Sequence, residues 1–433
     1  MLPVSSAEQS SGTRQDSPKH FSTVVAASLV TGLEMFDLTV FGFFAVVIGE
    51  QFFPAKDPLT SLLWSVGTFG IGFFMRPLGA LMIGAYADRK GRRAALTRTC
   101  WMMAVGTAAL GLCPPFADIG VAAPLIVLAG RLLQGFAVGG DIGVAAAFVM
   151  ETSPVSRRGY RVSWQLSSQG AAALMGATSG LLLTSMLPPA ELSAWGWRIP
   201  FLVGLLIAPV GLYLRCRLPD ATPHTRTTRS ASGPVAELFR QHRATIALAM
   251  LMGQTIPVYV IVYYMPSYAT RIMHMPARTG YLASALSALV LVVIPPLAGG
   301  LIDRLPRRKP LALTASACMI CLIYPVFLII GHATSTLAIL CGVALISVMV
   351  ALSAVTGTLL VLEAFPSRVR ATGMAVSHAL HVAVFGGTAQ FIVTGLIKLT
   401  GNPMSAAWYV TLACVVNFCA LVRFREQRSS ANT

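Results

Sequence analysis

The chain has 433 residues and carries few charges for its length. Apolar residues make up 55% of it, charged residues only 11%, and the mean hydropathy is +0.71, whereas soluble domains carry about 25% charged residues. So few charges cannot cover the surface of a soluble protein of this size. The composition therefore excludes a soluble fold and predicts an all-α protein that crosses a membrane many times.

The net charge of +16 would also fit a nucleic-acid-binding protein, but its placement argues against one. The basic residues lie in short segments between apolar runs, and no basic face is interleaved with aromatic residues. If both termini are cytoplasmic, the inward segments hold most of the 32 Lys and Arg residues, and the outward loops hold five: Lys56, Arg198, Arg271, Arg278 and Lys398. This bias follows the positive-inside rule and predicts a multi-pass membrane protein with both termini inside.

Residues 1–20 are polar and are predicted to form a cytoplasmic tail. Residues 21–214 then contain six apolar stretches of about 20 residues, the length that an α-helix needs to cross a hydrocarbon core of about 30 Å. These stretches predict an N-terminal six-helix bundle. The predicted spans are Phe21–Gly49, Thr60–Gly84, Ala94–Cys113, Val121–Met150, Val162–Leu187 and Gly196–Leu214.

The longest polar interruption covers residues 215–243, is rich in Pro, Thr, Arg and Ser, and is predicted to be a cytoplasmic central loop. Residues 244–423 are predicted to form a C-terminal six-helix bundle, followed by a cytoplasmic tail at 424–433. Its predicted spans are Ala244–Tyr268, Gly280–Ile302, Pro310–Gly331, Thr336–Leu362, Ala371–Ile397 and Ser405–Arg423.

Two sequence signatures occur once in each half of the chain. Asp303 follows Asp88 by 215 residues, and Glu363 follows Glu151 by 212. Such repetition is typical of a tandem duplication, so the two bundles are expected to be related by pseudo-twofold symmetry. In the first signature Gly84, Asp88, Arg89, Gly91, Arg92 and Arg93 recur as Gly299, Asp303, Arg304, Pro306, Arg307 and Arg308; in the second, Glu151, Pro154, Arg158 and Gly159 recur as Glu363, Pro366, Arg370 and Gly373.

Twelve spans, a long central loop and the segment Gly84–Arg93 (GAYADRKGRR) resemble the major facilitator superfamily. With RLLQGFAVGG at Arg131–Gly140 and WGWRIPF at Trp195–Phe201, the chain resembles the metabolite:proton symporter family within it, and most of all its citrate and tricarballylate members. The resemblance implies transport by alternating access, with Asp88 latching the two bundles by contacting an opposite helix end. The expected gate residues are Gly84, Asp88, Arg89, Gly91, Arg92, Arg93, Asp303 and Arg304, with Glu151, Arg158, Glu363 and Arg370 as weaker equivalents.

An ionisable side chain at the centre of a bilayer costs several kcal/mol, so each one needs a partner or a function. Glu34 and Asp37 lie three residues apart on one face of the first predicted helix. Arg76 and Arg131 are expected near the middle of the second and fourth helices, and Asp141 lies nearer the cytoplasm. Two carboxylates and two guanidinium groups therefore share one level of the N-terminal bundle, and the C-terminal half has no matching cluster.

A guanidinium group presents a rigid fork of donors that matches a carboxylate. Arg76 and Arg131 are therefore the candidate substrate ligands. An alternative is that each merely neutralises Glu34 or Asp37. Additional partners for the hydroxyl or carboxylate groups of a substrate are Gln165, Gln169, Tyr263 and His378.

Proton coupling needs a group whose pKa changes as the binding site opens to either side. Asp37 and Glu34 fit best, because each could exchange an arginine partner with an anionic substrate. Asp141 is a weaker candidate, since its position also suits a gate or a packing contact. His378 and His381 could titrate near neutral pH, or could simply be hydrogen-bonded packing residues.

The buried charges predict an anionic substrate. The resemblance implies a secondary active transporter of the bacterial inner membrane that imports a tricarboxylate or dicarboxylate, citrate or tricarballylate first, together with protons. Other substrates within the family are 2-oxoglutarate, shikimate and betaine-type osmolytes. Less favoured alternatives are a drug or metabolite exporter and a transporter-like membrane sensor. No GxxxxGK or HExxH motif is present, so neither ATP hydrolysis nor a zinc enzyme is expected. No cofactor or metal is expected, the partners are the substrate, protons and lipid, and a monomer suffices.

Overall fold

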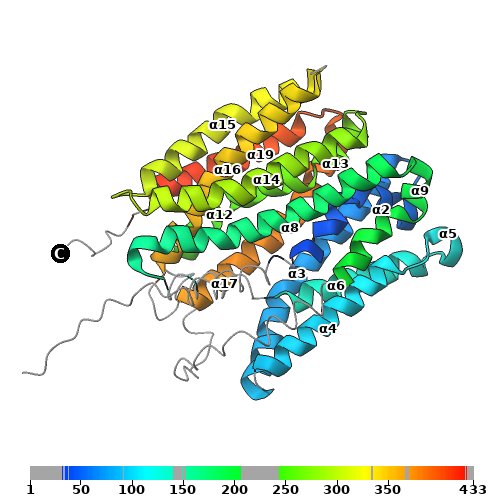
Figure 1. Cartoon of the computed structure of the whole chain (residues 1–433), viewed down its shortest axis with the longest axis horizontal. Coiled ribbons are helices and arrows are strands. Elements are labelled where there is room, and N and C mark those ends of the chain that lie inside the picture. Colours follow the sequence, from blue (N-terminus) through cyan, green and yellow to red (C-terminus); the bar gives the residue numbers. More distant parts are fainter. Residues whose placement is uncertain are drawn as a thin grey trace, which may run out of the picture.

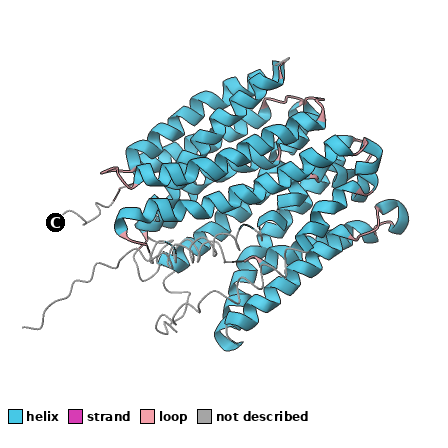
Figure 2. Ribbon diagram, in the orientation of Figure 1, coloured by secondary structure: helices cyan, strands magenta, loops and turns pink. Residues whose placement is uncertain are grey.

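The computed structural model describes residues 32, 35–37, 39–90, 92–139, 149, 153–205, 243–332, 335–365, 370–424 and 426. Within these ranges the regular structure is helical and contains no strand (Figures 1 and 2). The predicted tail at 1–20 and residues 215–242 of the predicted central loop lie outside the described residues, as does most of the C-terminal tail.

The first half begins with a helix that is bent at Phe44, between Met35–Phe43 and α2 (Ala45–Phe52), by 70°. Phe44 has φ −101° and ψ 16°, which departs from helical geometry and makes the bend. This differs from the single unbroken span predicted for this region. The other helices of this half are α3 (Pro58–Lys90), α4 (Arg92–Gly111), α5 (Phe116–Ile119), α6 (Ala122–Ala137), α8 (Arg158–Met186) and α9 (Pro189–Ala194), and residues 199–205 are also helical.

The second half lies beside the first, with its helices running in the same general direction (Figure 1). α16 and α19 begin at the residues predicted for them, because the apolar runs there are long and their edges are sharp. The helices of this half are α12 (Arg243–Val258), α13 (Met265–Ser267), α14 (Ala277–Ile302), α15 (Lys309–His332), α16 (Thr336–Ala364), α17 (Arg370–His381), α18 (Gly387–Thr400) and α19 (Ser405–Arg423).

Seven of the described helical segments are long and apolar enough to cross a membrane, and the bent first pair would make an eighth. Large apolar side chains on their outer faces are exposed, for example Trp64 at 61% and Leu297 at 65%. Buried polar side chains such as Gln134 and Gln390 lie inside instead. Apolar side chains thus face outward and polar side chains face inward, the reverse of a soluble protein. A lipid environment favours this arrangement.

Two helices predicted as continuous are interrupted by π-helical turns, at Tyr259–Tyr263 after α12 and at Val382–Gly386 between α17 and α18. Pro257 lies in the last turn of α12, just before the first interruption, and because proline has no N–H to donate this turn lacks one helical hydrogen bond. In the second, Gly386 and Gly387 follow each other at the junction. π-turns of this kind occur frequently at functional sites.

The two halves meet along two helix pairs, α8 with α14 and α3 with α18. Figure 1 shows α8 lying along α14. Glycines allow these backbones to approach closely. A Cβ on Gly170 would come 2.6 Å from the backbone of Leu291, and a Cβ on Gly70 would overlap the carbonyl oxygen of Gly387.

We call the end of the molecule where α3 and α14 finish the signature end, because both repeats of the first signature lie there, and the opposite end the far end. At the far end two ion pairs connect the halves. Arg271 pairs with Glu50, and Lys398 Nζ lies 3.0 Å from Asp57 Oδ2. These pairs hold the two halves together on this side.

Candidate functional site

Arg131 lies on α6 and is completely buried, with 0% of its surface exposed. Its Nη1 donates to Gln134 Oε1 at 3.0 Å, and its Nη2 donates to the carbonyl oxygen of Phe69 at 3.2 Å. The guanidinium group also lies against two aromatic rings, 4.8 Å from the centroid of Phe41 and 5.0 Å from that of Phe69. Stacking on rings of this kind stabilises a desolvated cation by about 0.5–2 kcal/mol.

Asp37 is connected to this arginine through two polar side chains. Thr107 Oγ1 donates to Asp37 Oδ2, and Gln134 Nε2 donates to Thr107 Oγ1 at 3.0 Å. Asp37 and Arg131 also attract each other electrostatically. We call Arg131, Gln134, Thr107 and Asp37 the N-bundle network. It joins a buried cation to a buried carboxylate across three helical segments, and so gives each charge a polar partner, although Asp37 Oδ1 has no hydrogen-bond partner among the described residues.

Arg76 lies on α3, is 4% exposed, and has its Cζ 4.2 Å from the centroid of the Phe73 ring. Its charge acts on His378 and His381 of α17 and on Tyr259 beyond α12, all of which belong to the second half. Arg76 is therefore a cation of the first half that faces the second.

Aromatic rings connect the two halves beside these arginines. Phe69 and Phe73 of α3 contact each other at 5.1 Å between centroids, and Tyr259 lies 6.3 Å from Phe69 and 5.7 Å from Phe73. Tyr263 follows at 5.3 Å from Tyr259 and reaches Phe43 of the first helix at 5.5 Å. The π-helical turn at Tyr259–Tyr263 thus presents its tyrosines to the aromatic surface that covers the arginines.

The two histidines of α17 lie against each other, with ring centroids 4.8 Å apart. His381 Nδ1 is 2.9 Å from the carbonyl oxygen of Ser377 one turn earlier, as expected of a packing histidine. His378 Nε2 is buried and has no hydrogen-bond partner among the described residues. His378 is therefore the member of the pair with a nitrogen still able to bind another group.

Of the predicted substrate and coupling residues, the structure brings Arg76, Arg131, Asp37, Tyr263 and His378 to one region. Gln165 and Gln169 lie one turn apart on α8, which packs along α14. Gln165 is buried and Gln169 is partly buried. Glu34 and Asp141 lie outside the described residues.

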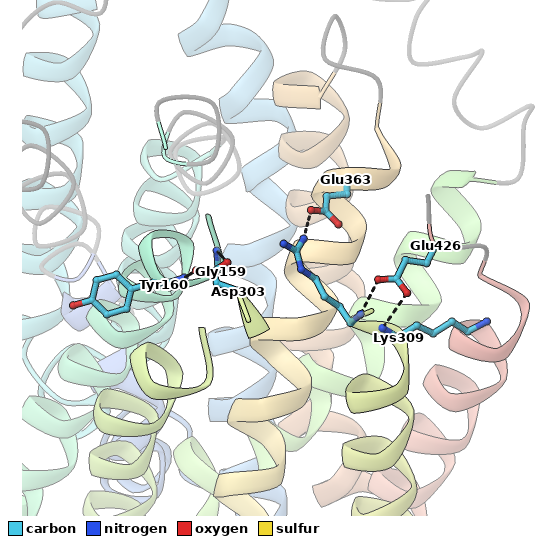
Figure 3. Close-up of polar contacts among 7 residues, drawn as sticks. Gly159, Tyr160, Asp303, Lys309, Glu363 and Glu426 are labelled. Carbon is cyan, nitrogen blue, oxygen red and sulfur yellow. Dashed lines mark hydrogen bonds and ion pairs between the residues drawn. The ribbon is translucent and has the colours of Figure 1, made fainter. Parts of the chain in front are cut away.

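At the signature end a carboxylate of the second half binds a helix end of the first (Figure 3). Asp303, which follows α14, accepts hydrogen bonds from the backbone N–H groups of Gly159 at 2.7 Å and Tyr160 at 2.9 Å. Burial raises the pKa of Asp303, and these two hydrogen bonds act in the opposite direction. Because the N-terminus of α8 carries unpaired N–H groups and a partial positive charge, it is a suitable partner for a carboxylate.

Two acidic residues of the second half bind the start of α15 (Figure 3). Arg308 pairs with Glu363. Glu426 accepts hydrogen bonds from the backbone N–H groups of Arg308 at 2.7 Å and Lys309 at 3.3 Å. These contacts tie the repeated signature to α16 and to the residues that follow α19.

The first copy of the signature is described only in part. Arg89 is exposed at the end of α3, and Arg304 in the second copy is exposed as well. The contacts of Asp88 expected from the duplication stay a prediction. The side chains or surroundings of Gly84, Asp88, Arg92, Arg93 and Arg370 are not described, and Gly91 and Glu151 lie outside the described residues. Arg158 is partly buried at the start of α8.

Sequence reasoning missed Thr107, Gln134 and Phe69, which contact the predicted charges directly. Gln134 was detectable, since it follows Arg131 by three residues and so shares its helix face. Thr107 and the Phe69 carbonyl carry no such signal, because they come from other helices. In the described part of the chain, no three His, Cys, Asp or Glu side chains gather in a way that could hold a metal.

Residues 27–389 of the chain match the family described as the Major Facilitator Superfamily. A citrate-proton symporter of Klebsiella pneumoniae is 36% identical over 398 residues, which cover 90% of this chain and 88% of that protein. An alpha-ketoglutarate permease of Escherichia coli (strain K12) is 32% identical and covers 94% of both chains.

A solved structure of the xylose transporter XylE from E. coli, in a partially occluded inward-open conformation, superposes with a TM-score of 0.76. The match covers 96% of this chain and 100% of that one at 16% sequence identity. At this identity the likeness concerns the fold, an all-helical arrangement of twelve spans.

Proposed function

Since the chain belongs to the Major Facilitator Superfamily, we propose that it is a secondary active transporter that imports a tricarboxylate or dicarboxylate together with protons, with citrate or tricarballylate as the preferred substrate. The observation that carries this proposal is the N-bundle network, in which buried Arg131 is linked to buried Asp37, beside Arg76. The relatedness to a citrate-proton symporter supports the same substrate class.

In this proposal Arg76 and Arg131 bind the carboxylates of the substrate. Arg76 already faces the second half through His378 and Tyr259, so a substrate between the halves reaches it first. Arg131 lies behind Phe69, whose carbonyl oxygen accepts one of its hydrogen bonds. A shift of Phe69 would open the guanidinium group to an anion. Tyr263, His378, Gln165 and Gln169 are proposed to bind the remaining polar groups of the substrate.

Asp37 is proposed to carry the coupled proton. Its charge is balanced in part by Arg131, through Gln134 and Thr107. When an anionic substrate binds Arg131, the guanidinium group stabilises the charged form of Asp37 less strongly. The Asp37 carboxylate then becomes more easily protonated. Substrate binding and proton binding then favour each other. Glu34 and Asp141 stay secondary proposals for the same path.

Alternating access would occur if the contacts between the two halves broke at one end of the molecule at a time. Opening the far end requires separation of Arg271 from Glu50 and of Lys398 from Asp57. Opening the signature end requires Asp303 to leave the N-terminus of α8. Asp88, Gly84, Gly91 and the neighbouring arginines are proposed to act in the same way at the opposite helix pair.

The chain is a multi-pass protein of the inner membrane. We place both termini and the signature end on the cytoplasmic side, because the signature loops carry a concentration of basic residues. The domain division proposed is a tail at 1–20, bundles at 21–214 and 244–423, a central loop at 215–243 and a tail at 424–433. One chain contains both faces of the site, so a monomer suffices for transport, and no enzymatic step is needed.

A second candidate substrate is 2-oxoglutarate, favoured by the relatedness to an alpha-ketoglutarate permease. Two buried arginines suit any dicarboxylate, so the choice between the two acids depends on the groups that surround the arginines. The same arginines disfavour efflux of hydrophobic cations, because the site would repel them.

The proposal is tested by uptake into proteoliposomes that contain the purified protein. With an inward-directed proton gradient, labelled citrate is expected to accumulate above its external concentration, and a protonophore is expected to abolish the accumulation. Unlabelled tricarballylate, 2-oxoglutarate and betaine serve as competitors. Competition by betaine alone, or absence of uptake of every carboxylate, would show that the substrate class is wrong.

A further inference from the structure

Gln390 on α18 is a buried polar residue that none of the roles above uses. Its side chain is completely buried, with 0% of its surface exposed. Both its amide oxygen and its amide nitrogen are buried, and neither has a hydrogen-bond partner among the described residues. In an apolar interior an amide left unpaired costs several kcal/mol. Such an amide is suited to bind a partner that arrives during the working cycle.

Gln390 faces the other half of the molecule. Its Nε2 lies 3.3 Å from the position that a Cβ would take on Gly42, beside the ring of Phe69. Phe69 is the residue whose ring and carbonyl oxygen contact the Arg131 guanidinium group. One turn before Gln390, Gly387 packs on Gly70 of α3. The amide is therefore a group of the second half placed at the aromatic surface that covers the arginine.

The polar groups next to Gln390 on its own helix are already paired. Thr394 Oγ1 hydrogen-bonds with the hydroxyl of Tyr264 at 2.6 Å and with the backbone carbonyl oxygen of Gln390 at 2.8 Å. These bonds satisfy Thr394 and Tyr264 without the Gln390 side chain. Among the described residues of α18, the Gln390 amide is thus a polar group that remains available to a ligand.

The side-chain amide of glutamine carries two N–H donors and an acceptor oxygen, so it needs both acceptor and donor partners. An ionised carboxylate offers acceptors only, so it would leave Gln390 Oε1 unpaired. A hydroxyl group next to a carboxylate offers both a donor hydrogen and an acceptor oxygen. The geometry therefore favours a substrate that carries a hydroxyl group beside its carboxylates.

We propose that Gln390 recognises the hydroxyl group of a hydroxylated polycarboxylate and so makes the transporter prefer it over the same acid without the hydroxyl. This inference rests on the proposed function and adds a specificity-determining residue from the second half. The arginines attract any carboxylate, and Gln390 distinguishes acids that carry the hydroxyl group from acids that lack it. An amide that loses its partner in a dry site disfavours the wrong ligand strongly.

The test compares Gln390→Leu with wild type in proteoliposomes, using citrate against tricarballylate and malate against succinate. Each pair differs by the hydroxyl group. In Gln390→Leu the half-saturation concentration for citrate is expected to rise about tenfold or more, the loss of a hydrogen bond in a buried site, while that for tricarballylate changes by less than about twofold. Gln254→Leu serves as the matched control, because Gln254 is a buried amide of the same half that packs on Gly357.

Gln390→Asn, which keeps the amide but withdraws it by one methylene, is made alongside in case the leucine variant does not insert stably. It is expected to shift the preference in the same direction. An unchanged ratio of citrate to tricarballylate affinity in a well-folded variant would overturn the role of Gln390 and leave the proposed function intact. A wild-type protein that transports no carboxylate would overturn both.

Discussion

Arg131 and Asp37 are charged side chains that lie buried in the interior of the first half and are stabilised there by polar and aromatic neighbours. The two are linked through Gln134 and Thr107, and the guanidinium group lies against two aromatic rings. Pairing with each other is therefore compatible with the roles proposed for Arg131 and Asp37 in substrate and proton binding. The network stabilises the buried charges, and in the proposed mechanism an anion that binds Arg131 weakens the attraction between Arg131 and Asp37.

Asp37→Asn is expected to keep exchange of citrate across the membrane and to lose accumulation driven by a pH gradient. The asparagine preserves the hydrogen bond from Thr107 but cannot bind and release a proton. The measurement is counterflow compared with gradient-driven uptake in the same vesicles. Asp118→Asn, an exposed carboxylate on α5, is the control and should behave like wild type. Accumulation at the wild-type level in Asp37→Asn would remove Asp37 from the proton path.

The charged members of the network could be predicted from sequence because charges in apolar runs are rare, and counting residues from a helix end gives their depth. Their partners could not. Thr107 and the Phe69 carbonyl oxygen meet the charges only because α4 and α3 pack against α6 in this arrangement. Neutral polar residues are common in such helices, so nothing in their local sequence marks them.

The lengths of the helices could be predicted from the apolar runs in the sequence, but the positions of their interruptions could not. The π-helical turns at Tyr259–Tyr263 and Val382–Gly386 depend on proline and glycine acting with the packing of neighbouring helices. Both turns lie beside α3, where Tyr259 contacts Phe73 and a Cβ on Gly386 would lie 2.9 Å from the Tyr259 ring. The irregular backbone thus lies at the seam between the halves.

Gly70→Ala is expected to slow transport about tenfold without preventing insertion. A methyl group there would overlap the Gly387 carbonyl oxygen and keep α3 and α18 apart, and overpacking of this kind costs about 1–3 kcal/mol. The measurement is the citrate exchange rate at matched protein content. Gly300→Ala on α14 is the control, because nothing lies within 4 Å of a Cβ there. Equal rates for the two variants would mean that close approach of α3 and α18 is not needed.

At the scale of the whole molecule, the halves are tied at both ends in the described residues. Hydrogen bonds from Thr60 and then Lys398 lower the pKa of Asp57 to about 2. A lowered pKa favours the charged carboxylate in the folded protein. This contribution is complete above the unfolded value of about 3.9 and is lost as pH falls through about 2. The Asp57 carboxylate therefore stays charged, and able to pair with Lys398, at the mildly acidic pH that drives import.

The duplication is the part of the whole molecule that the sequence predicts best. The repeated signatures lie at matching helix ends, and in the second half Asp303 contacts the first half there. The sequence indicated Asp303 as a gate residue, but the contacts that tie the far end were not predictable. Glu50 lies on α2 and Arg271 lies in a π-helical turn at Tyr268–Ile272, far apart in sequence, and nothing in their local sequence marks them as partners.

Asp303→Asn is expected to shift the population toward molecules that are open at the signature end. The substitution removes a negative charge from the N-terminus of α8, a contribution of about 0.3–2 kcal/mol. Spin labels at Ser156→Cys and Arg304→Cys, both exposed at this end in opposite halves, report the separation by pulsed electron resonance. A longer distance is expected in Asp303→Asn than in wild type. Identical distance distributions would mean that Asp303 does not hold this end closed.

The most direct test of the account is citrate binding to purified Arg131→Ala, measured by titration calorimetry against wild type and against Arg278→Ala, which removes an exposed arginine. Loss of paired, charge-assisted hydrogen bonds to a carboxylate predicts affinity about a hundredfold weaker in Arg131→Ala, with Arg278→Ala unchanged. A folded Arg131→Ala protein that binds citrate as tightly as wild type would contradict the claim that this buried arginine binds the substrate.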